Sequence, residues 1–124
     1  VYAQTDLGNI IGRNITPLDS AIFISQLSMN SPNGIDISFF DIEKTNKITA
    51  GIQVGNVNLS MPPNVKYMHE TKAKMQTEYN QPMFERSDEC RERCFQKFEN
   101  IEAKEGMTII TTTVEKAGNT VSIN

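Results

Sequence analysis

The residues with the clearest chemical potential are two cysteines, Cys90 and Cys94, and a single histidine, His69. The cysteines are four residues apart in a stretch that reads as a helix, which would place both thiols on one face, one turn apart. With His69 and the adjacent Glu70 they could supply the four ligands of a zinc ion. Structural zinc sites favour tighter, loop-borne pairs, so buried and reduced thiols are the simpler interpretation.

Other chemistry remains open for the same residues. Cys90 and Cys94 are candidate redox thiols or intermolecular thiols, although their spacing differs from the two-residue separation of thioredoxin-type motifs. His69 is a candidate pH-sensitive group because an unperturbed imidazole titrates at about pH 6.5. The competing interpretation, which we favour for His69, is an exposed histidine on a helix.

Catalytic motifs are missing from the sequence. It contains no glycine-rich phosphate loop, no Gly-x-Ser-x-Gly elbow and no His-Glu-x-x-His pattern. A chain with one histidine and no clear pairing of nucleophile and base is not expected to be an enzyme. We therefore predict no catalytic residue, no metal site and no cofactor.

Composition excludes further classes. The chain has 124 residues, a formal net charge of −3 and a pI of about 5.1, which fits one domain and argues against nucleic acid as a partner. No apolar run approaches the roughly 20 residues that span a bilayer. The sequence begins at Val1 instead of Met, which is compatible with processing or trimming, so neither a cytoplasmic nor an extracytoplasmic location is assigned.

Charge density indicates where helices and strands should lie. Charged side chains are concentrated in residues 62–106, a pattern typical of solvent-facing helices. This block predicts a charged helical hairpin, with helices over 64–79 and 87–106. The second helix would begin at the capping residue Ser87, end at Gly106, and carry both cysteines on its apolar stripe.

The sparsely charged flanks predict strands. Alternation of apolar and polar residues at 35–39 predicts a strand that runs to about 43, and a second strand is predicted from 48 to 59 with a β-bulge near Gly55-Asn56. Residues 107–115 are rich in threonine and predict a third strand. Residues 120–123 are predicted to pair with 107–115 as a hairpin. Residues 17–29 are ambiguous, and a helix beginning at Thr16-Pro17 is slightly favoured over a strand. Residues 1–12 have weak periodicity and are expected to be loose.

Together these elements predict a single α+β domain over residues 1–124, with about four antiparallel strands and two or three helices packed on one face. The function that fits best is a non-enzymatic protein–protein interaction or assembly subunit, with a protein partner or self-association. The alternative is an extracytoplasmic domain that binds or senses a small ligand. Its pocket would lie between the sheet and the helices and be lined by Phe39, Phe40, Phe95 and Phe98.

Overall fold

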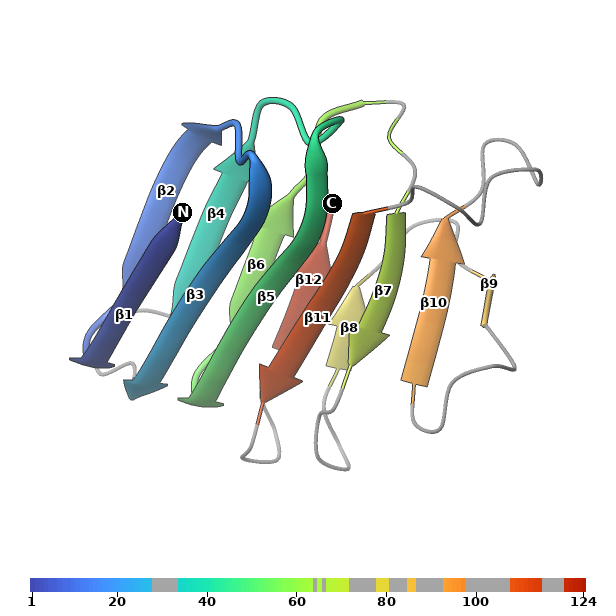
Figure 1. Ribbon diagram of the computed structural model, residues 1–124. Helices are drawn as coiled ribbons and strands as arrows, with labels where there is room; N and C mark the ends of the chain where they lie inside the picture. The colour runs from blue at the N-terminus through green and yellow to red at the C-terminus, as the bar shows by residue number, and fades with distance from the viewer. Residues whose placement is uncertain are drawn as a thin grey trace.

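The protein folds into two β-sheets that lie face to face (Figure 1). The computed structural model describes residues 1–27, 34–63, 65, 67–71, 78–80, 85–86, 93–97, 108–114 and 120–124. All the regular secondary structure assigned within these residues is β-strand. They are β1 (Tyr2–Leu7), β2 (Ile10–Ile15), β3 (Asp19–Leu27), β4 (Ile35–Phe39), β5 (Thr45–Val54), β6 (Val57–Ser60), β7 (Tyr67–Thr71), β8 (Glu78–Asn80), β9 (Glu85–Arg86), β10 (Arg93–Lys97), β11 (Thr108–Val114) and β12 (Thr120–Ile123).

The repeating unit is a β-arch, which we define as one strand in each sheet joined by a turn. The first sheet has seven strands in the order β1-β3-β5-β11-β7-β10-β9, and the second has five in the order β2-β4-β6-β12-β8. Consecutive arches stack side by side, so the described strand pairs are parallel except those of β10, which runs antiparallel to β7 and β9.

One arch lies out of chain order. The β11–β12 arch is placed between β5–β6 and β7–β8 in both sheets, although β7 and β8 precede it in the sequence. β11 pairs with β5 on one side and with β7 on the other, while β12 pairs with β6 and β8. This arch therefore forms the interior of the stack (Figure 1).

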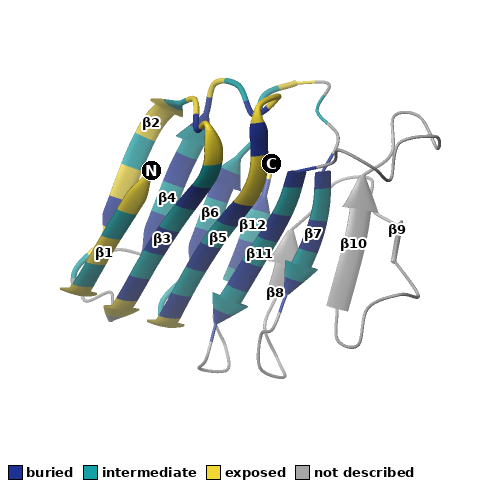
Figure 2. Cartoon of the chain, viewed as in Figure 1, coloured by how far each residue is buried: buried dark blue, intermediate teal, exposed yellow. Residues whose placement is uncertain are grey.

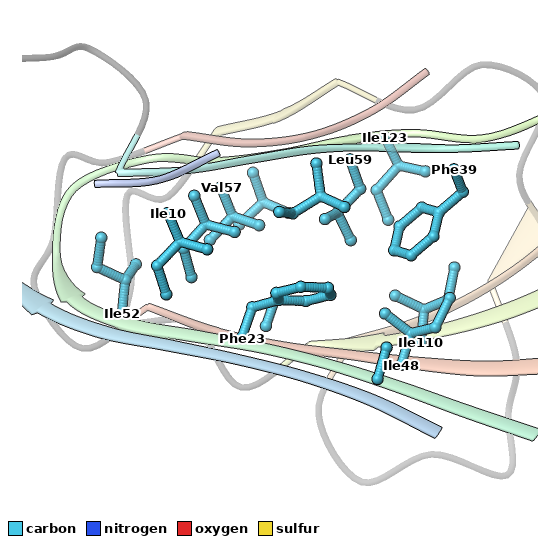
Figure 3. Packing of buried hydrophobic residues seen from close by; sticks show 14 of the residues in the cluster. Ile10, Phe23, Phe39, Ile48, Ile52, Val57, Leu59, Ile110 and Ile123 are labelled. Carbon is cyan, nitrogen blue, oxygen red and sulfur yellow. The ribbon is translucent and has the colours of Figure 1, made fainter. Parts of the chain in front are cut away.

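The core fills the space between the two sheets. Burial alternates strictly along β4, β6, β7 and β11, as the banding in Figure 2 shows, because successive side chains of a strand point to opposite faces. Phe23 and Phe39 meet across the gap edge to face, with ring centroids 6.2 Å apart (Figure 3). Ile35, Val57 and Val121 lie in register on neighbouring strands and are almost fully buried.

Glycine and asparagine form the two described turns that lead from β1 to β2 and from β5 to β6. Gly8 and Gly55 have φ angles of 128° and 142°, which an L side chain rarely adopts, and each is followed by asparagine. The Asn56 backbone oxygen accepts hydrogen bonds from the amides of Gly34 and Ile35 at 2.9 and 3.0 Å. Its side-chain oxygen accepts from the Thr120 amide at 2.8 Å. Turn residues thus tie neighbouring arches together.

The predicted α+β class is wrong for the described part of the chain, which holds no helix and whose sheets are mainly parallel. The expected charged helical hairpin of residues 62–106 contains β7, β8, β9 and β10. In β7 the buried residues Tyr67, His69 and Thr71 alternate, but two of them are polar. Their period of two was therefore hidden from a hydrophobicity pattern.

The predicted helix over 87–106 is wrong where it can be compared. Residues 93–97 form β10, which pairs with β7 over five register positions, and the rest of that segment lies outside the described residues. Intrinsic helix propensity is a weak preference that tertiary pairing overrides. Residues 17–29 likewise give β3 instead of the slightly favoured helix. Pro17 is buried, and its carbonyl accepts a hydrogen bond from the Thr45 hydroxyl at 2.7 Å.

Strand locations were predicted better than strand pairing. β4, β11 and β12 lie within or at the expected ranges. Residues 1–12, in contrast, were expected to be loose but form β1 and the start of β2. The expected hairpin of 107–115 with 120–123 is wrong because β11 and β12 belong to different sheets. The phase slip at Gly55-Asn56 is not a bulge in one strand but the turn that carries the chain from β5 to β6.

Candidate interaction edge

Strand β1 ends the first sheet, and β3 is its one neighbour among the described strands (Figure 1). The amino group and the carbonyl of Val1 both bond to β3: the amino group donates to the Ser20 oxygen at 3.1 Å, and the carbonyl accepts from the Ile22 amide at 2.9 Å. In a parallel ladder, alternate residues bond to the same neighbour. Tyr2, Gln4 and Asp6 therefore turn their N–H and C=O groups away from β3.

The side chains of β1 leave this edge accessible. Tyr2, Gln4 and Asp6 are exposed, whereas Ala3 and Thr5 are half-buried toward the core. The Tyr2 hydroxyl donates a hydrogen bond to the Gln4 side-chain oxygen along the outer face. β1 contains neither lysine nor proline, and its register with β3 has no bulge. Apart from the carboxylate of Asp6, the devices that commonly blunt an edge strand are thus missing from β1.

The strand that ends the second sheet at the same end of the stack, β2, is protected. Its register with β4 shifts between Gly12 and Ile15, and Asn14 has a φ of 54°, a bulge of the kind that disturbs edge pairing. The Arg13 guanidinium closes the bulge by donating to the backbone oxygens of Gly12 and Asp36 at 2.9 and 3.0 Å. It also pairs with the Asp36 carboxylate at 2.9 Å.

Exposed apolar side chains mark the same end of the stack. Five large apolar residues are exposed among the described ones, and three of them, Val1, Tyr2 and Ile11, belong to the end arch or begin it. The other two, Leu18 and Phe40, lie on the β2–β3 and β4–β5 connections. The Phe40 amide donates to the Ile15 oxygen at 2.9 Å, which places it beside the end of β2.

Phe39 and Phe40, two of the four phenylalanines of the alternative pocket, lie in different environments. Phe39 is 4% exposed and packs against Phe23 in the core, whereas the neighbouring Phe40 is 70% exposed. Phe95 lies in β10, in register with His69, and Phe98 lies outside the described residues. Phe39 and Phe40 therefore cannot line one surface.

His69 lies in the interior of the first sheet and not on an exposed helix. It is fully buried, and its Nε2 lies 2.6 Å from the Thr112 hydroxyl of β11. Burial also raises the pKa of the nearby Tyr67 hydroxyl well above its usual range by removing the group from water. A histidine enclosed by paired strands can hold a hydrogen bond, but it offers a substrate no access.

Of the two cysteines, the structure describes the backbone of Cys94 alone. Cys94 lies in β10 with its backbone in register with Glu70, and Cys90 lies outside the described residues. Within the part of the chain that the structure describes, no three His, Cys, Asp or Glu side chains gather as a metal site would require. Among the same residues, no helix has the length and apolar character to cross a membrane.

Sequence reasoning missed the edge residues. Tyr2, Gln4 and Asp6 alternate with Ala3 and Thr5, but small inward side chains give only a faint strand signal. The recurrence of Gly-Asn before β2 and β6 would have been a better guide to the arches. The arrangement defines a two-sheet stack of β-arches in which the outer edge of β1 pairs with no other described strand. Comparison with protein-family models, with curated proteins and with solved structures finds no match to this chain.

Proposed function

We propose that this protein is a non-enzymatic assembly module that joins other protein by strand addition at the β1 edge. The observation that carries the proposal is the outward row of backbone groups at Tyr2, Gln4 and Asp6, on a strand that has no lysine, proline or bulge. An added strand would satisfy these groups and extend the first sheet by one strand. The apolar side chains Val1 and Tyr2 on the same strand would lose exposed surface on binding.

The expected affinity is modest. An antiparallel partner could form about six hydrogen bonds, two at each of three outward residues. At a net contribution of roughly 0.5–1.5 kcal/mol each, they would total about 3–9 kcal/mol. Lost translational and rotational freedom costs about 4–15 kcal/mol, so burial of Val1 and Tyr2 must supply the difference. Association is therefore expected to be weak and dependent on concentration.

A single proline tests the edge. Gln4→Pro removes an outward N–H group and adds ring bulk at the edge, while the bonds of Ala3 and Thr5 to β3 are retained. Gln4→Ala is the matched control because it shortens the same side chain and keeps the N–H. Molar mass by light scattering over a wide concentration range should rise for the native chain and for Gln4→Ala. It should stay at the 13.9 kDa of one chain for Gln4→Pro.

Thermal melting at low concentration provides the folding control, and the two variants should melt within a few degrees of each other. Association of Gln4→Pro to the same extent as the native chain would contradict an edge on β1. A native chain that stays monomeric at every concentration would contradict self-association altogether.

A further inference from the structure

We infer that the strand added to β1 is β1 of a second copy of this chain, antiparallel to the first and related to it by a two-fold axis through Gln4. This inference rests on the proposed function, since it assigns partner and register to the same edge. The outward backbone groups of β1 belong to alternate residues, Tyr2, Gln4 and Asp6, and this alternation decides which registers can form hydrogen bonds.

An antiparallel pair bonds fully where two outward residues face each other, because such a pair exchanges both N–H···O bonds. With the axis at Gln4, Tyr2 faces the partner's Asp6, Gln4 faces the partner's Gln4, and Asp6 faces the partner's Tyr2. All three outward residues of each strand are used. Shifting the axis to Ala3 or Thr5 leaves two such pairs, so the register centred on Gln4 forms the longest ladder.

Charge favours the same register. Asp6 is the only charged side chain in β1. The axis at Gln4 separates the two Asp6 residues by four residues of strand, about 14 Å, which exceeds the screening length of about 8 Å in physiological salt. Each carboxylate instead lies opposite Tyr2, which is uncharged and whose hydroxyl already donates to Gln4. An axis at Asp6 would bring the two carboxylates face to face and pair Gln4 with Gly8, beyond the end of the strand.

The geometry of the other sheet limits the contact to the first. β2 carries the Gly12–Ile15 register shift, and its Arg13 guanidinium is already bound to Asp36. Because the β2 edge is bulged and Arg13 already bonds to the neighbouring strand, this edge cannot pair regularly with an added strand. The two-fold operation closes on itself, so it produces a dimer and not an open fibre.

Cysteine cross-linking tests the register in the full chain. In a Cys90→Ser/Cys94→Ser background, Gln4→Cys should form a reducible dimer under mild oxidation. Hydrogen-bonded antiparallel pairs have Cα atoms about 5.5 Å apart, within the disulfide range of about 4.4–6.8 Å. Tyr2→Cys and Asp6→Cys should each remain monomeric alone and cross-link when mixed. Thr113→Cys, on the outer face of the interior strand β11, measures random collision.

The expected result is a several-fold excess of cross-linked dimer for Gln4→Cys, and for the Tyr2→Cys and Asp6→Cys mixture, over Thr113→Cys. Dimer yields no higher than those of Thr113→Cys would overturn the inference. If Gln4→Pro blocks association while Tyr2→Cys cross-links with itself, the register is wrong and the proposed edge stands. If Gln4→Pro associates normally, the inference and the proposed function fail together.

Discussion

Gly12 is a position where one added methyl group should crowd the stack. A Cβ atom placed on Gly12 would lie 2.5 Å from Ile15 Cδ1 and 3.1 Å from Ile37 Cδ1. Carbon atoms in contact normally lie about 3.5–4.0 Å apart, so the Ile15 side chain must move by about 1 Å. Gly12 does not have a positive φ, so backbone strain does not enter the comparison.

The magnitude follows from how Ile15 can respond. Distorting its rotamer costs about 0.5–1.5 kcal/mol, and turning its terminal methyl into solvent costs about 0.8 kcal/mol. Replacing glycine by alanine restricts the unfolded chain and returns about 0.4–1 kcal/mol. The first two terms destabilise the folded chain and the third offsets part of them. Because Ile15 and Ile37 are both crowded, Gly12→Ala is expected to lower the free energy of unfolding by about 0.5–1.5 kcal/mol.

Urea unfolding of four variants would check this reasoning. Gly51→Ala is the matched control, because its Cβ would lie 3.9 Å from Thr113 Cβ, an ordinary contact; it should stabilise by up to about 1 kcal/mol. Ile15→Val removes the colliding methyl, so adding Gly12→Ala to it should cost little or nothing. A coupling energy of about 1 kcal/mol between the two sites is expected. Equal effects of Gly12→Ala in both backgrounds would refute the proposed collision.

Two further predictions concern the polar interior. Thr112→Val keeps the side-chain shape but removes the hydroxyl beside His69 Nε2, so it should lower the free energy of unfolding by about 1–3 kcal/mol. Thr112→Ser keeps the hydroxyl and is the control. Unchanged stability of Thr112→Val in urea unfolding would refute a stabilising hydrogen bond. The raised pKa of Tyr67 means that the unfolded chain ionises first, so stability should fall as the pH rises above about 10. Tyr67→Phe should reduce that alkaline slope in urea midpoints measured against pH, and an unaltered slope would show that other groups cause it.

Strand positions were predictable where apolar residues alternate without interruption, as in β4 with Ile35, Ile37 and Phe39. The pairing of strands was not, because an alternating segment identifies its buried face but not its neighbour. The β-arch and the β-hairpin both place a turn between two alternating segments. Gly55-Asn56 illustrates the ambiguity, since the same phase slip fits a bulge or a passage between sheets.

The candidate edge was still less predictable. Whether an N–H group on β1 is free depends on which strands pair with it, and that is a property of the completed sheet. The same limit applies to His69, whose burial follows from its place between β11 and β10 and not from its polar neighbours Glu70 and Thr71. Protein association stays a prediction, and we propose this edge as its location.

The placement of β11 and β12 has a consequence for how the chain reaches its final state. Arches stacked in chain order could form one after another as the chain is synthesised, each on its predecessor. Here β5 and β7 must remain two strand spacings apart, about 9.6 Å, until β11 arrives. If β7 pairs directly with β5, that non-native pair must separate before β11 can insert between them. Folding of the region from β5 to β12 is thus expected to be slow, and to be completed by insertion into the middle of the stack.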